Sequence, residues 1–172
     1  NVLAGVNLEG NRFFYLNPLE ADGIKPFNHG MRGRSPWFGT ACCPSNLARL
    51  IPQVPGLMYA TTQNEIYCSF YAGSTTTLTL EKGNVHLKQT TEYPFSETIR
   101  WEVTPEKEGQ PFTMHLRIPT WTGNQFVPGE LYSYVNTTPS GWSIKINGKE
   151  TKAEVKKGFA TIDRTWKKGD VV

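Results

Sequence analysis

Hydrophobic and polar residues alternate along most of the chain after residue 60, and this alternation predicts β-strands. Side chains of an extended chain point to opposite sides in turn, so apolar residues two apart share one face. This spacing recurs at Ile66, Cys68 and Phe70, at Leu78 and Leu80, at Val85 and Leu87, at Ile99, Trp101 and Val103, and at Met114, Leu116 and Ile118. Strands separated by turn residues predict an antiparallel β-sandwich.

The last part of the chain continues the pattern. Ile144 and Ile146 lead into Asn147-Gly148, the strongest short-range signal for a β-hairpin. Residues 158–163 predict another strand. We therefore expect residues 60–172 to form a jelly-roll-like β-sandwich domain. We expect it to be truncated at its C-terminal end, because Val171-Val172 would normally continue into a strand.

One segment has helical rather than strand spacing. Apolar residues three, four and seven positions apart predict one face of a helix, and they are Leu47, Leu50, Ile51 and Val54. Pro44, Ser45 or Asn46 suits the start of this helix, and Pro52 limits its length. Cys42 and Cys43 therefore lie at or just before the N-terminus of this helix.

The first 59 residues have a different character from the rest. Residues 12–16 predict a short strand between turns, and residues 23–35 predict a polar loop that runs over a surface or lines a cleft. These pieces cannot bury the helix by themselves. We expect residues 1–59 to be the remnant of another domain, with the boundary between residues 57 and 63.

Composition excludes several classes of protein. With 38% hydrophobic and 19% charged residues, the chain resembles a folded globular protein rather than a disordered one. The net charge of +3 is spread along the chain, which argues against a nucleic-acid partner. No apolar run approaches the roughly 20 residues needed to cross a bilayer, so no membrane partner is expected.

The adjacent cysteines carry the most specific chemistry in the chain. A thiol at a helix N-terminus faces unpaired N–H groups and the positive end of the helix dipole, which favour the thiolate. Cys42 or Cys43 is therefore a candidate nucleophile or zinc ligand, although a four-coordinate zinc site needs further ligands. Cys68 fits a buried structural role, His29 is a loop candidate for the site, and His86 and His115 are expected on strands without a site role.

A series of short motifs covers essentially the whole chain. The motifs are Asn17-Pro18-Leu19, Arg34, Trp37-Phe38, Ala41-Cys42-Cys43-Pro44 with Asn46 and Ala48-Arg49, Ile66-Tyr67, Tyr71-Ala72-Gly73-Ser74, Gln89-Thr90-Thr91 with Tyr93-Pro94, Leu116-Arg117-Ile118-Pro119 with Trp121, Ile146-Asn147-Gly148, and Arg164-Thr165-Trp166-Lys167 with Gly169-Asp170. In this order they resemble the β-L-arabinofuranosidases of glycoside hydrolase family 127.

The resemblance implies that residues 1–59 end a catalytic (α/α)6 helical barrel and that a β-sandwich follows. It implies that Cys42 is both nucleophile and zinc ligand and that Cys43 is a second zinc ligand. The family's Glu-x-Cys ligand element and its acid/base carboxylate belong to upstream sequence that this chain lacks. The implied activity is retaining hydrolysis of β-L-arabinofuranosides or related plant-type glycans, with the rest of the polypeptide as partner. The fragment alone is expected to be inactive, with zinc absent or partial.

The residues by themselves are also compatible with two other interpretations. The sandwich could be a non-catalytic packing or carbohydrate-binding module, and an exposed platform of Trp101, Trp121 and Trp142 would favour binding. The cysteine pair could also be a purely structural zinc or buried-thiol element. Trp37 and Phe38 are candidates for sugar contact or for packing, and Arg34 for pairing with a carboxylate or a sugar hydroxyl.

Overall fold

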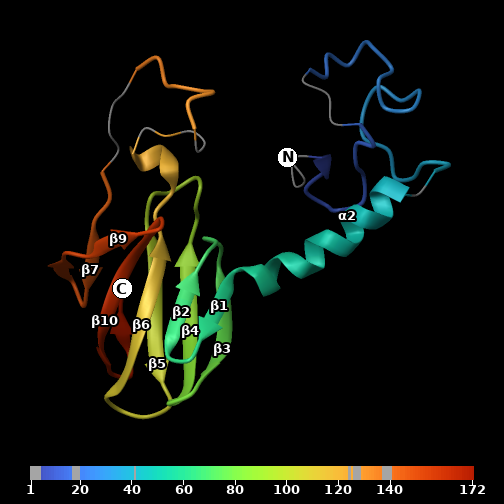
Figure 1. Ribbon diagram of the computed structural model, residues 1–172. Helices are drawn as coiled ribbons and strands as arrows, with labels where there is room; N and C mark the ends of the chain where they lie inside the picture. Colours follow the sequence, from blue (N-terminus) through green and yellow to red (C-terminus); the bar gives the residue numbers. More distant parts are fainter. Residues whose placement is uncertain (1–4, 17–19, 41, 124, 126–128, 137–140) are drawn as a thin grey trace. The chain divides into compact units, whose positions relative to one another are not determined.

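The computed structural model describes the chain except for residues 1–4, 17–19, 41, 124, 126–128 and 137–140 (Figure 1). The chain divides into two compact units, Asn1–Pro55 and Gly56–Val172. No helix in the described ranges is both long enough and apolar enough to span a membrane.

The first unit consists of loops followed by one helix. Isolated β-bridges join Val6 to Phe13, Phe13 to Ser35, and Asn28 to Met31. The strand expected at residues 12–16 is wrong, because only Phe13 makes bridges there. Asparagine side chains instead accept hydrogen bonds from backbone N–H groups of this segment. Asn7 Oδ1 accepts the N–H of Arg12, and Asn28 Oδ1 accepts the N–H of Tyr15. Such side-chain bonds compete with strand pairing.

Helix α2 (Cys42–Gln53) confirms the predicted helix and its start beside the cysteine pair. Pro52 lies inside the last turn, and the chain tightens into the 3-10 helix η1 (Val54–Leu57). The Ser45 hydroxyl donates to the carbonyl of Cys42 at 3.1 Å, so it does not cap the helix start. In the described part of the chain, Leu50 and Val54 stay 40% and 41% exposed. The apolar stripe is thus only partly covered.

The second unit is a β-sandwich (Figure 1). Its strands are β1 (Tyr59–Thr62), β2 (Glu65–Cys68), β3 (Ser74–Leu80), β4 (Gly83–Thr91), β5 (Ile99–Pro105), β6 (Gln110–Arg117), β7 (Ile144–Ile146), β8 (Lys149–Thr151), β9 (Glu154–Lys156), β10 (Phe159–Trp166) and β11 (Asp170–Val171), with the 3-10 helix η2 (Thr120–Gly123) after β6. The predicted mainly-β fold, with one short helix near the start, is confirmed.

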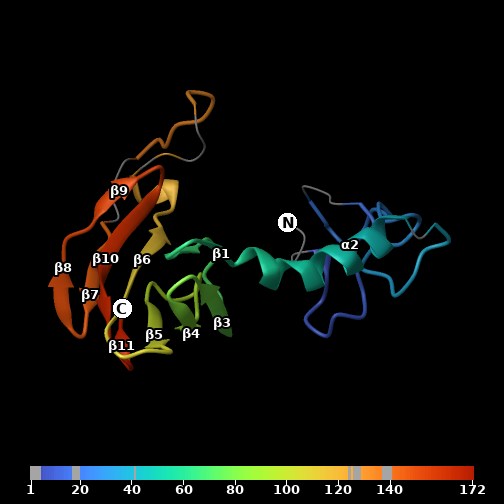
Figure 2. The ribbon, with the colours of Figure 1, turned by 60° about the horizontal axis from the view of Figure 1, so that its bottom comes forward.

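Two sheets face each other, as the turned view in Figure 2 shows. One has the strand order β1-β2-β6-β10-β9 and the other β11-β5-β4-β3. All pairs are antiparallel except β2 with β6, which is parallel. The predicted antiparallel sandwich thus has one exception, the parallel pair β2–β6. The chain leaves β2, forms three strands of the opposite sheet and returns to lie beside β2 in the same direction, which a crossover permits.

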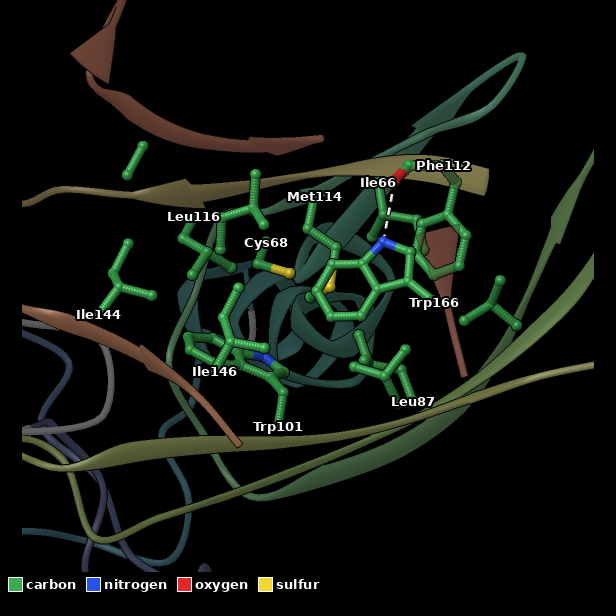
Figure 3. Close-up of a cluster of buried hydrophobic side chains, with 14 of the residues drawn as sticks. Ile66, Cys68, Leu87, Trp101, Phe112, Met114, Leu116, Ile144, Ile146 and Trp166 are labelled. Atoms are coloured by element: carbon green, nitrogen blue, oxygen red, sulfur yellow. Dashed lines mark hydrogen bonds between the residues drawn. The ribbon is translucent and has the colours of Figure 1, made fainter. Parts of the chain in front are cut away.

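The core lies between the two sheets and contains the residues that the alternation predicted. Its centre includes Ile66, Leu87 and Met114, all fully buried. Trp166 is also fully buried, stacks on Phe112 and donates its indole N–H to the carbonyl of Phe112 at 2.8 Å (Figure 3). The prediction fails for Phe70, which is 45% exposed because β2 ends at Cys68.

The Asn147-Gly148 signal is confirmed as the turn of hairpin β7–β8. Asn147 and Gly148 have φ angles of 50° and 78°, the left-handed values that a type I′ turn requires at both central positions. Lys157 and Gly158 join β9 to β10 with φ angles of 50° and 81°. Lysine is uncommon in this conformation, which explains why the sequence did not signal the second turn.

Asp170 connects the end of β10, strand β11 and hairpin β7–β8. Its buried carboxylate accepts bonds from Asn147 Nδ2 at 2.7 Å and from the N–H of Lys167 at 2.9 Å, and Arg164 lies 3.5 Å away. Burial acts to raise the pKa of Asp170, but the bonds from Asn147 and Lys167 and the charge of Arg164 outweigh it and lower the pKa.

We predict that Asp170→Asn destabilises the second unit by about 2 kcal/mol at neutral pH, because charged hydrogen bonds of this kind are lost. A carboxyl whose folded pKa is lowered stabilises the fold above its unfolded pKa, and this contribution disappears as the pH falls through the folded value. The difference between Asp170→Asn and the unmodified chain should therefore shrink below about pH 4. Urea unfolding at several pH values measures it, with exposed Asp163→Asn as the matched control. A difference that is constant with pH would contradict the assignment.

Candidate active site at the start of helix α2

Cys42 is the first residue of α2, and its side chain is exposed. The first N–H groups of a helix have no intrahelical acceptor and, together with the helix dipole, favour negative charge nearby. The sulfur therefore lies in an environment that stabilises a thiolate and is open to a reactant.

Tyr15 makes the closest described contact with this sulfur. Its hydroxyl oxygen lies 2.9 Å from Cys42 Sγ. A phenol is a stronger donor than a thiol, so the favoured arrangement has the hydroxyl donating to sulfur. Hydrogen bonding to the charged form favours that form, which adds to the effect of the helix terminus.

Asn28 fixes the backbone that carries Tyr15. Its side chain is fully buried, and Oδ1 accepts the N–H of Tyr15 at 2.7 Å while Nδ2 donates to the carbonyl of Gly33 at 2.9 Å. A buried side-chain amide whose oxygen and nitrogen both form hydrogen bonds holds two loop segments together. Asn28 thus sets where the Tyr15 hydroxyl is presented.

Aromatic rings surround Tyr15 on its other sides. The ring centroids of His29 and Phe38 lie 4.1 Å and 5.3 Å from that of Tyr15, both in edge-on geometry. Phe38 is only 6% exposed and also contacts Phe13 at 5.6 Å, so it packs within the unit rather than being available to a sugar. His29, a loop candidate from the sequence, therefore lies beside Tyr15 and Cys42.

The neighbouring candidates have separate positions. Trp37 is 63% exposed and stays available for contact with a ligand. Arg34 donates from Nε to the carbonyl of Gly5 at 3.3 Å and lies over the ring of Phe14 at 4.5 Å. Through these contacts, Arg34 stabilises the loop structure of the first unit.

Part of the predicted site lies outside the described residues. Cys43 is the second residue of α2, but its side chain is not among those described, and neither are residues 17–19 nor Ala41. Within the described ranges, no group of three or more His, Cys, Asp or Glu side chains is arranged to hold a metal ion. The described side chains do not by themselves make a zinc site.

The remaining thiol and histidines lie in the second unit. Cys68 is completely buried, and desolvation strongly raises the pKa of its thiol, which confirms its structural role. His86 is exposed on β4, as expected. The alternation of His115 with Met114 and Leu116 predicts an exposed side chain, and this prediction is wrong, because the side chain is only 13% exposed. It stacks on Tyr67 at 4.2 Å and lies 3.2 Å from the Thr161 hydroxyl.

The three tryptophans whose joint exposure would favour a binding module are not all exposed. Trp101 is 4% exposed and belongs to the core, whereas Trp121 and Trp142 are 48% and 40% exposed. The alternative of a buried-thiol element does not fit Cys42, whose side chain is exposed.

Tyr15 and Asn28 are the site residues that the sequence did not reveal. Both precede the cysteine by more than a dozen residues and reach it only through loop folding, so no periodicity marks them. The usable signal was the position of Tyr15 two residues before the Asn17-Pro18-Leu19 motif.

Comparison with known proteins finds the same family along both units. Residues 1–56 match the catalytic domain of GH127 β-L-arabinofuranosidases, and residues 65–172 match the middle domain of the same enzymes. A non-reducing end β-L-arabinofuranosidase of Bifidobacterium longum subsp. longum is 25% identical over 166 residues, which are 93% of this chain and 23% of that protein.

Solved structures agree with the sequence comparison. A GH127 β-arabinofuranosidase matches 98% of this chain with 40% identity and a TM-score of 0.86. A GH127 β-L-arabinofuranosidase from Geobacillus stearothermophilus matches 98% of this chain with 35% identity and a TM-score of 0.75. In both cases the chain covers 25% of the solved chain, so it spans about a quarter of the length of these relatives.

We predict that Tyr15→Phe slows alkylation of Cys42 by iodoacetamide about threefold at neutral pH. Without the hydroxyl donor, a smaller fraction of Cys42 is thiolate. The remaining thiolate is a somewhat stronger nucleophile, but this gain offsets only part of the loss. The rate is measured by mass spectrometry in a Cys43→Ser background. Tyr93→Phe in the second unit is the matched control and should leave the rate unchanged. An equal rate for Tyr15→Phe and the parent would show that the hydroxyl does not act on sulfur.

Proposed function

Because this chain belongs to the glycoside hydrolase family 127 β-L-arabinofuranosidases, we propose that it is part of a retaining glycosidase in which Cys42 is the nucleophile. The observation that carries the proposal is the exposed Cys42 sulfur at the start of α2, 2.9 Å from the Tyr15 hydroxyl. A nucleophile needs both access to substrate and a neighbour that favours its reactive form.

The chemistry follows the double displacement of retaining enzymes. The Cys42 thiolate attacks the anomeric carbon, so the C–S bond forms as the glycosidic C–O bond breaks, and an acid group protonates the departing oxygen. Water, deprotonated by the same group, then displaces sulfur and releases the sugar with its original anomeric configuration. The thiolate is regenerated. The acid/base group belongs to the part of the parent protein that this chain does not contain.

Tyr15 acts in this scheme as a positioning residue. Its hydroxyl donates to the sulfur, restricts the Cys42 side chain and stabilises negative charge on it when the thiolate is regenerated. Asn28 supports this role through its bond to the Tyr15 N–H. Preorganised donors near a developing charge are a common source of catalytic stabilisation.

We propose that zinc is held in the parent protein by Cys42, Cys43 and ligands from outside this chain. When bound, zinc keeps coordinating thiols deprotonated at neutral pH. The described residues supply no group of three ligands, and the proposal places the remaining ligands in the longer protein.

The substrate and domain roles are proposed from the same membership. Residues 1–59 would form the last segment of a catalytic helical barrel and residues 60–172 the following sandwich, with the rest of the polypeptide as partner. The substrate would be a β-L-arabinofuranoside or a related plant-type glycan, in accordance with the names of the matched families.

In the full-length protein, Cys42→Ala should reduce hydrolysis of an aryl β-L-arabinofuranoside by at least about a thousandfold, because the covalent pathway loses its nucleophile. Release of the aryl group measures the rate, and circular dichroism checks the fold. Cys68→Ala is the control, since it removes a buried thiol of the second unit and should leave turnover by the folded protein in place. Retained hydrolysis in a folded Cys42→Ala protein would rule out the nucleophile role.

For the 172-residue chain alone, we predict no measurable turnover of the same substrate and less than one zinc per chain, because the acid/base and further ligands lie elsewhere in the parent. Metal analysis of the dialysed chain and a discontinuous activity assay test this. The full-length protein is the positive control. Clear turnover by the 172-residue chain would mean that its own residues complete the catalytic site.

A further inference from the structure

A hollow of about 600 Å³ opens on the second unit, where Trp142 precedes β7. We call it the Trp142 hollow, and it is lined by Trp142, Ile144, Ala153, Glu150, Thr151 and Lys152. Its volume lies within the roughly 300–1,000 Å³ typical of small-ligand sites. The Trp142 hollow belongs to the second compact unit, whereas Cys42 belongs to the first.

Hairpin β7–β8 builds the hollow. Figure 2 shows this hairpin at the flank of the sandwich. Ile144 pairs with Thr151 in the ladder, and Ile144 is only 7% exposed, so this end of the hairpin is anchored in the core. Trp142 and Ala153 lie just beyond the paired residues, one on each chain segment. The hollow is thus a feature of an ordered hairpin rather than of a loop tip.

The lining combines one aromatic surface with hydrogen-bonding groups. Trp142 is 40% exposed and presents part of a flat apolar ring system together with an N–H donor. Glu150 and Lys152 are also lining residues, and both are exposed. A carboxylate accepts hydrogen bonds and an ammonium donates them.

This combination suits a sugar better than other small ligands. A sugar ring has an apolar face of C–H groups that can lie on an indole and a rim of hydroxyls that both donate and accept. The opposite charges of Glu150 and Lys152 give the lining no net preference for an anion or a cation. A neutral ligand with many hydroxyls uses the acceptors, the donors and the indole together.

We propose that the Trp142 hollow is a binding subsite for a neutral oligosaccharide. It holds a sugar ring against the indole of Trp142, and Glu150 and Lys152 bind the ring hydroxyls. In the parent glycosidase such a subsite retains a glycan chain without cleaving it. The inference does not require Cys42 to be the nucleophile.

The test is isothermal titration calorimetry of the 172-residue chain with a linear arabinofuranose trisaccharide, with maltotriose as a second neutral trisaccharide. We expect saturable binding of at least one of them. Trp142→Ala should weaken it at least about tenfold, because the stacking surface is removed. Trp121→Ala removes an indole of similar exposure outside the hollow and should leave affinity unchanged. Glu150→Gln keeps the indole and should weaken binding about threefold.

A Cys42→Ser chain separates this proposal from the catalytic one and should bind the trisaccharide as tightly as the parent chain. Thermal unfolding by circular dichroism identifies variants that fail to fold. If Trp142→Ala fails to fold, the affinity of Glu150→Gln tests the proposal instead. The proposal is overturned by absence of binding of both trisaccharides, by equal losses in Trp142→Ala and Trp121→Ala, or by loss of binding in Cys42→Ser. None of these results affects the nucleophile test in the full-length protein.

Discussion

Burial of the inner face of each sheet against the other is the interaction on which the second unit depends. The fully buried side chains include Trp166, Ile66, Leu87 and Met114, and each such side chain contributes roughly 1.5–3 kcal/mol relative to an exposed one. The indole N–H of Trp166 would oppose this burial if it had no acceptor, and the carbonyl of Phe112 supplies one. The core therefore combines apolar packing with a satisfied polar group at its largest side chain (Figure 3).

Features at the edge of the sandwich follow from this core. Strand β11 crosses to the second sheet, and the buried carboxylate of Asp170 connects that crossing to the turn of β7–β8 through Asn147. The hairpin is in turn anchored by Ile144 and Ile146, each 7% exposed. Ile144 is thus both a core residue and part of the lining of the Trp142 hollow, which ties this surface site to the core.

The candidate active site rests on a different kind of structure. In the first unit, the described residues form little regular pairing, and the buried Asn28 side chain substitutes for a ladder by bonding Tyr15 and Gly33. The Tyr15 hydroxyl and the start of α2 then meet at the Cys42 sulfur. The surroundings of the Cys42 sulfur are the Tyr15 hydroxyl and the helix start, whereas Cys68 is completely buried. One chain thus holds two thiols in opposite environments.

Sequence alone determined what depends on neighbouring residues. Alternation located the strands around Val85, Trp101 and Met114, Asn147-Gly148 located a hairpin, and helical spacing placed Cys42 at a helix start, because each is set within a few residues. Tertiary structure decided the parallel pairing of β2 with β6, the exposure of Phe70, the stacking of His115 on Tyr67, and the contact of Tyr15 with Cys42. These features join segments far apart in the chain, and no local preference encodes which segments meet.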